Sequence, residues 1–183
     1  MKLTPTPAGI EICPGPAGGK EWPHGAYSPA TGLLYTPTVD ACGTFKLIPG
    51  EFHESLPYWG GEATVSPEQV KGIQIKAFDP TTGYEVWSWK GRHPMVSSLP
   101  VTKAGLLFAG EPTGEFDAFD AKTGALLWQF QTGSGIHSNP VTYAVDGRQY
   151  VAVPTGWGGW IKGFAPELYG GARGSALVVF ALP

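Results

Sequence analysis

Residues 75–91 read Ile-Lys-Ala-Phe-Asp-Pro-Thr-Thr-Gly-Tyr-Glu-Val-Trp-Ser-Trp-Lys-Gly, and residues 116–133 read Phe-Asp-Ala-Phe-Asp-Ala-Lys-Thr-Gly-Ala-Leu-Leu-Trp-Gln-Phe-Gln-Thr-Gly. Both contain the pattern Ala-Phe-Asp-x-x-Thr-Gly-x-x-x-Trp, which recurs 41 residues later, as from Trp87 to Trp128. A period near 40 residues fits one four-stranded blade of a β-propeller. Helical repeats of similar length exist, but a helix would not tolerate Asp-Pro-Thr-Thr-Gly in its interior.

Each copy of the pattern predicts a β-hairpin. An alternating strand leads into an Asp-x-x-Thr-Gly turn, where Asp can accept backbone hydrogen bonds and Gly can adopt positive φ. The small Ala leaves room for a large ring, and a buried Trp needs a carbonyl partner for its indole N–H. Such rings would join neighbouring blades. The predicted tryptophan-docking positions are Ala77, Gly83 and Trp87 in the first copy, and Ala118, Gly124 and Trp128 in the second.

The remaining sequence favours short strands joined by Gly/Pro turns. Residues 140–153 predict a hairpin with an Asp-Gly turn, and residues 27–35 contain a diverged turn of the repeated kind. Residues 43–72 lack clear periodicity and are expected to form a long loop or excursion, whereas residues 176–182 are expected to form a terminal strand. We therefore expect an all-β fold, a partial β-propeller of three to four blades over residues 1–183. A closed propeller needs at least four.

Composition narrows the function classes. The chain is 42% hydrophobic and 13% aromatic, which excludes a disordered chain despite its 27 Gly and 18 Pro. Its net charge of −3 and scattered basic residues argue against nucleic acid as a partner. The longest apolar run is too short to span a membrane. Spacing alone leaves open whether Cys13 and Cys42 are buried thiols or a disulfide.

The repeat resembles the tryptophan-docking motif of quinoprotein alcohol dehydrogenases, which use pyrroloquinoline quinone (PQQ). Further segments resemble the same family in the same order, namely residues 13–22, 26–35, 132–153 and 156–160. The resemblance covers nearly the whole chain except residues 43–72. It implies an eight-bladed propeller with PQQ near the central axis, of which this chain would be the C-terminal portion.

The resemblance also implies four cofactor-binding residues. Gly159 and Trp160 match a Gly-Trp pair that lies beside the cofactor in the family, and Trp22 matches a Trp that could line the same pocket or pack in the core. Glu21 stands where the family has an Asn whose amide contacts the quinone. Val96 stands where many relatives have a Trp.

A disulfide between Cys13 and Cys42 follows from the same resemblance. It would imply an oxidising compartment, and we expect the periplasm or another exported location. The family's catalytic Asp and the ligands of its Ca²⁺ or lanthanide ion lie in earlier blades. We therefore expect no catalytic residue and no metal ligand within this chain.

The sequence is compatible with two functions. The first is part of a PQQ-dependent dehydrogenase that oxidises an alcohol or aldehyde and passes electrons to an acceptor such as a cytochrome c or a quinone. The alternative is a non-catalytic propeller scaffold that uses the same repeat for protein–protein interaction. Under the first, residues 1–183 alone should be inactive without the rest of the propeller.

Overall fold

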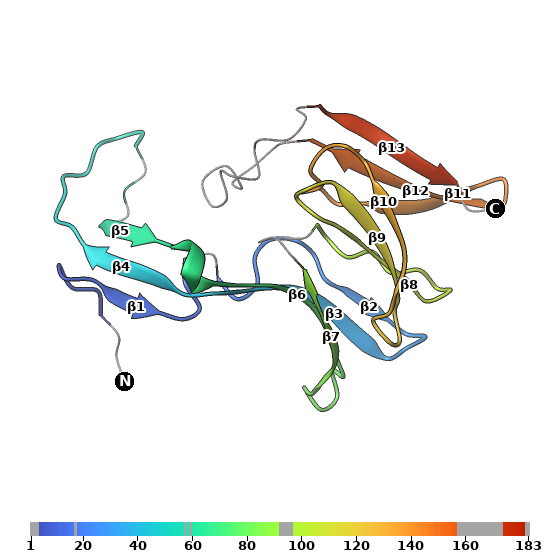
Figure 1. The fold of residues 1–183 in the computed structure, drawn as a ribbon, viewed down its shortest axis with the longest axis horizontal. Coiled ribbons are helices and arrows are strands. Elements are labelled where there is room, and N and C mark those ends of the chain that lie inside the picture. The colour runs from blue at the N-terminus through green and yellow to red at the C-terminus, as the bar shows by residue number, and fades with distance from the viewer. Residues whose placement is uncertain are drawn as a thin grey trace. The chain divides into compact units, whose positions relative to one another are not determined.

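A computed structural model describes residues 4–16, 18–56, 58, 60–91, 97–156 and 174–181, and these residues form mainly β-strands (Figure 1). The elements are β1 Ile10–Ile12, β2 Ala26–Ser28, β3 Leu33–Ala41, β4 Gly43–Leu47, β5 Gly61–Thr64, the 3₁₀ helix η1 Pro67–Gln69, β6 Val70–Phe78, β7 Glu85–Gly91, β8 Leu106–Gly110, β9 Glu115–Asp120, β10 Leu126–Gln131, β11 Val141–Val145, β12 Arg148–Thr155 and β13 Ala176–Ala181. Within this described part, no α-helix has the length and hydropathy that a membrane span requires.

Three antiparallel sheets follow one another along the larger of two compact units, residues 20–39 and 72–183. Their strand orders are β2-β3-β6-β7, β10-β9-β8 and β11-β12-β13 (Figure 1). A single bridge between Val101 and Leu107 on β8 gives the second sheet the beginning of a further strand. Sequential up-and-down strands in repeated sheets are the blades of a partial β-propeller, as the 41-residue repeat predicted.

The two copies of the repeat form equivalent hairpins, β6–β7 and β9–β10. Ala77 pairs with Trp87 and Ala118 pairs with Trp128, and both hairpins have a register irregularity next to this pair. A bulge at the same place in both copies strengthens the local twist and turns the tryptophan relative to its strand. The two copies of the sequence repeat therefore pair their strands in the same register.

The two Asp-x-x-Thr-Gly turns are closed by the same backbone hydrogen bond. Gly83 N donates to Asp79 O at 2.7 Å, and Gly124 N donates to Asp120 O at 2.8 Å. Both glycines have positive φ, 76° and 75°. Hydrogen bonds from threonine hydroxyls and backbone amides in each turn lower the pKa of both aspartates. In each turn the aspartate side chain thus accepts hydrogen bonds from the residues that follow it and stabilises the turn.

Trp87 joins the first sheet to the second. Its indole Nε1 donates to the carbonyl oxygen of Ala121 at 3.1 Å, in the turn that follows β9. A Cβ atom added to Gly124 would lie 2.6 Å from Trp87 Cε3, so the ring occupies the space that a side chain would need. The turn of one repeat is therefore the docking site for the tryptophan of the preceding repeat.

Trp128 has different surroundings. Its ring stacks on Phe130 with centroids 5.9 Å apart and meets Phe180 of β13 edge-on at 5.2 Å. Among the described residues its indole N–H has no hydrogen-bond partner, and the ring is 41% exposed. The residues that follow Trp128 by the same spacing as Ala121 follows Trp87 lie outside the described part.

Two apolar clusters fill the spaces between successive sheets. The first joins the first and second sheets and contains Leu33, Tyr35, Ile75, Ala77, Leu99, Leu107, Ala109, Phe119 and Ala121. The second joins the second and third sheets and contains Phe108, Phe116, Ala118, Ile136, Val151 and Val153. Small residues on the central strands allow close face-to-face packing, which explains why both repeats begin with alanine.

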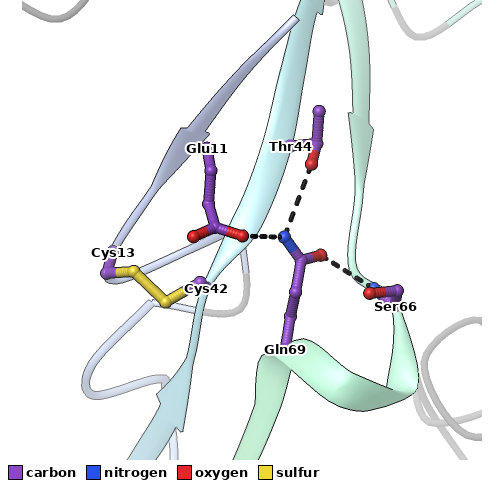
Figure 2. Close-up of a disulfide and its surroundings, with 6 residues drawn as sticks. All are labelled: Glu11, Cys13, Cys42, Thr44, Ser66 and Gln69. Atoms are coloured by element: carbon purple, nitrogen blue, oxygen red, sulfur yellow. Dashed lines mark hydrogen bonds between the residues drawn. A yellow bond between two sulfur atoms is a disulfide. The ribbon is translucent and has the colours of Figure 1, made fainter.

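The smaller unit, residues 1–19 and 40–71, contains the sheet β1-β4-β5. Cys13 and Cys42 form the disulfide that the family resemblance implied, with Cα atoms 4.4 Å apart. Beside it Gln69 Nε2 donates to Glu11 Oε2 at 2.7 Å, and Gln69 Oε1 accepts from Ser66 N at 3.0 Å (Figure 2). A cross-link and the side-chain amide of Gln69 thus hold β1 to the rest of the unit.

The segment 43–72, expected to form a long loop or excursion, contains regular secondary structure. It contains β4, β5, η1 and the start of β6, and β4 pairs with β1 on one side and β5 on the other. The strands were not evident from the sequence because β5, Gly61–Thr64, is short and shows no apolar alternation.

Candidate functional site

The expected cofactor residues fall into two groups. Glu21 and Trp22 belong to the described part of the larger unit, whereas Gly159 and Trp160 lie outside the described residues, as do Val96 and Trp157. Glu21 is half-buried and Trp22 is 51% exposed, so Trp22 is not packed in the core. The geometry of the site can therefore be built from the Glu21–Trp22 side.

A lysine shapes the segment that carries Glu21 and Trp22. Lys20 Nζ donates to the carbonyl oxygen of Glu21 at 2.8 Å and to that of Pro23 at 2.9 Å. An ammonium group has three donors, so one remains after these two hydrogen bonds. The lysine closes the segment into a loop and places a positive charge next to Glu21 and Trp22.

His24 connects this loop to the second sheet. Its Nδ1 lies 3.0 Å from the carbonyl oxygen of Trp22. A carbonyl oxygen only accepts, so Nδ1 carries the proton. The backbone of His24 makes two further hydrogen bonds, from its N to Ser98 Oγ at 2.7 Å and from Leu99 N to its O at 2.9 Å.

Ser98 extends this connection to the third sheet. It is buried, and its Oγ donates to Asn139 Oδ1. His24 precedes β2, Ser98 precedes the Val101 bridge and Asn139 precedes β11, so each residue stands just before the first strand of its sheet. Hydrogen bonds therefore join three successive sheets at the same end of their first strands.

No sequence motif marks these hydrogen-bonded residues directly. Pro100-Val101 and Pro140-Val141 recur at a spacing close to the main repeat, and this marks the residues before them as equivalent starts of blades. Ser98 recurs as Ser138 at this spacing, but Leu99 stands where Asn139 stands in the next sheet, so the asparagine does not repeat. The hydrogen bonds depend on contacts between blades, which the strand pattern alone does not give.

Comparisons with known proteins agree with this architecture. The family model described as the β-propeller domain of glucose/ethanol/alcohol dehydrogenases (PQQ) matches residues 90–151. Quinoprotein alcohol dehydrogenase PedH of Pseudomonas putida is 36% identical over 180 residues, which cover 95% of this chain and 30% of PedH. A lanthanide-dependent methanol dehydrogenase of Methylacidiphilum fumariolicum is 40% identical over 154 residues, covering 81% of this chain and 25% of that enzyme.

A solved structure is similar too. The europium-containing methanol dehydrogenase superposes with a TM-score of 0.84 at 33% identity, over 94% of this chain and 35% of that one. The fold and its repeat thus define a propeller of the PQQ type. The chain belongs to the quinoprotein alcohol dehydrogenase family, and it spans 30% and 25% of the length of the two curated relatives named.

The described half of the site fits a planar polycarboxylate such as PQQ in its donor set. Trp22 offers an exposed aromatic side chain, Lys20 offers a cation with one N–H that no described residue accepts, and Asn139 is exposed and carries an amide. Flat apolar faces with a few convergent donors are what such a ligand requires. Glu21 is the exception, because an ionised carboxylate only accepts hydrogen bonds.

A metal site is not found in the described residues. There, Glu11, Cys13 and Cys42 are grouped closely enough to be considered as ligands. Both cysteines are disulfide-bonded, so neither can supply the thiolate that binds a metal. The group is structural.

We expect His137, in the loop before β11, to make the stability of the larger unit depend on pH. Its Nε2 is buried and has no hydrogen-bond partner among the described residues, and burial lowers the pKa of its imidazole. Above the pKa of the unfolded chain, about 6.5, both states are neutral. As pH falls through that value the unfolded state binds the proton first. Acidification therefore lowers the free energy of unfolding.

We expect the urea concentration at the midpoint of unfolding to decrease as the pH is lowered from 7.5 to 5.5. This pH range lies above the one in which exposed carboxylates titrate. His137→Gln should flatten this decrease, whereas His53→Gln, at an exposed histidine of the smaller unit, should retain it. Equal pH dependence in the His137→Gln variant and the unmodified chain would contradict the assignment.

Proposed function

We propose that this chain is the C-terminal part of a PQQ-dependent dehydrogenase that oxidises an alcohol or aldehyde. The observation that carries the proposal is the similarity of 95% of the chain to proteins described as quinoprotein alcohol dehydrogenases. The repeat alone would not carry it, because the same repeat can build a scaffold. The similarity extends well beyond the two copies of the repeat, residues 75–91 and 116–133.

Within such an enzyme, bound PQQ supplies a quinone that accepts the two electrons and the hydrogen removed from the alcohol carbon. The residues of this chain bind and orient that group. Trp22 would cover part of its ring face, and Lys20 would neutralise part of its carboxylate charge. The general base and a Ca²⁺ or lanthanide ion would be supplied by residues outside this chain.

The electrons would leave to a cytochrome c or a quinone acceptor, and the protein would act in the periplasm or in another exported location. The Cys13–Cys42 disulfide supports an oxidising compartment, because stable disulfides are rare in the cytosol.

The test uses the full-length gene product. After addition of PQQ with Ca²⁺ or with a lanthanide, it should reduce an artificial electron acceptor when a primary alcohol or an aldehyde is supplied. Residues 1–183 alone should show no such activity under the same conditions. Alcohol-dependent turnover by residues 1–183 alone would contradict the proposal that the catalytic base and ion lie elsewhere.

The alternative is a non-catalytic scaffold, and the same experiment separates it. A full-length product that neither binds PQQ nor oxidises alcohols, but captures a protein partner through the propeller, would favour the scaffold. The exposed Trp22 and its hydrogen-bonded surroundings favour the enzyme, because packing between blades does not require a solvent-facing ring at this end.

A further inference from the structure

The hydrogen bonds around Ser98 determine how the amide of Asn139 is oriented. Ser98 Oγ accepts from His24 N at 2.7 Å. Its own hydroxyl proton is donated to Asn139 Oδ1. Because the carbonyl oxygen of the Asn139 amide faces Ser98, its Nδ2 group, with two N–H donors, faces away from the buried serine.

Asn139 and Trp22 lie at the same end of the larger unit. Trp22 O is bonded to His24 Nδ1, His24 N is bonded to Ser98 Oγ, and Ser98 Oγ is bonded to Asn139. Trp22, His24 and Asn139 are exposed, whereas Ser98 is 5% exposed. A buried hydroxyl thus connects two exposed groups that have the chemistry of a ligand site, a ring face and an amide donor.

We infer that Asn139 donates a hydrogen bond to an oxygen of bound PQQ, and that Ser98 is a positioning residue that orients this amide and holds the Glu21–Trp22 segment beside it. The inference rests on the proposed function. The donor matters because Glu21, when ionised, has no hydrogen-bond donor to offer. Asn139 would supply an amide donor from the neighbouring sheet.

The decisive variant is Asn139→Asp in the full-length gene product. Aspartate keeps an oxygen that can accept from Ser98, so the hydrogen bond between the sheets is retained. It replaces the outward N–H donors with an anionic oxygen that repels a tricarboxylate. We expect the dissociation constant for PQQ, measured by equilibrium dialysis without substrate, to rise roughly 10- to 100-fold. The thermal midpoint should remain close to that of the unmodified protein.

Ser98→Ala tests the positioning role without any ligand. We expect hydrogen exchange in peptides that contain His24 to become roughly tenfold faster, because the His24 amide loses its acceptor. PQQ affinity should fall several-fold. The matched control is Ser138→Ala, which removes an adjacent hydroxyl bonded to the carbonyl oxygen of Pro154 and should change neither measurement.

The outcomes are distinct. If the unmodified protein binds PQQ and Asn139→Asp binds it equally well, the role of Asn139 is wrong while the proposed function stands. If Ser98→Ala leaves His24 exchange unchanged, the positioning role is wrong. If the unmodified protein binds no PQQ, the proposed function and this inference are both overturned.

Discussion

Trp87→Ala should destabilise the larger unit by about 3–4 kcal/mol, close to the lower limit for removal of a tryptophan from a core because the ring is only partly buried. Two losses add. A cavity remains against the turn at Gly124, and the carbonyl oxygen of Ala121 loses the indole donor. For a chain of this size the melting temperature should fall by roughly 10 °C, measured by circular dichroism.

Two variants separate these losses. Trp87→Phe keeps an aromatic ring but removes the N–H group, so it should cost about 1 kcal/mol from the unpaired carbonyl. Tyr84→Ala removes an aromatic side chain from the same hairpin where it is 77% exposed, and it should change the stability by less than about 0.5 kcal/mol. Equal effects of Trp87→Ala and Tyr84→Ala would show that the ring does not join the sheets.

Gly124→Ala probes the same contact from the other side. Its φ of 75° is unfavourable for alanine, and the added Cβ would overlap Trp87. Only the overlap should disappear when Trp87 is also alanine. The double variant should therefore be more stable than the sum of the two single changes predicts, and strict additivity would exclude the contact.

Much of the fold could be predicted from the sequence because its signals are local. The hairpins at 75–91 and 116–133 follow from turn chemistry and alternation, and Asp146-Gly147 forms the tight turn between β11 and β12 with positive φ at both residues. The 41-residue period then gives the arrangement of blades. The sequence predicts that the indole N–H of Trp87 has a carbonyl partner. That this partner is Ala121 follows only from the stacking of two sheets.

The candidate site was less predictable. Trp22 could be marked by family resemblance, but its exposure depends on contacts that no sequence pattern records. Ser98 and Asn139 make their contacts across sheet boundaries, about 40 residues apart. A serine in a Gly/Pro-rich loop is usually a turn residue, and only the register of three blades brings it between His24 and Asn139.

Loss of the Cys13–Cys42 disulfide should unfold the smaller unit selectively. None of its described residues belongs to either apolar cluster, so strand pairing and the cross-link carry much of its stability. The cysteines are 29 residues apart, and the chain-entropy model gives about 3–4 kcal/mol for such a loop. Exchanging both for serine should greatly accelerate hydrogen exchange in 4–16 and 40–56, and leave β8–β12 protected.

Gln69→Ala is the matched control, because it removes the hydrogen bonds to Glu11 and Ser66 but keeps the disulfide. It should cost only about 1 kcal/mol, so exchange in β1 and β4 should accelerate far less than in the serine variant. Reduction of the unmodified chain with a phosphine should give the same hydrogen exchange as the serine variant. The same treatment should not change hydrogen exchange in the serine variant. Unchanged protection of β1 and β4 after reduction would mean that the sheet β1-β4-β5 is stable through backbone pairing alone. The disulfide would then add little to the fold.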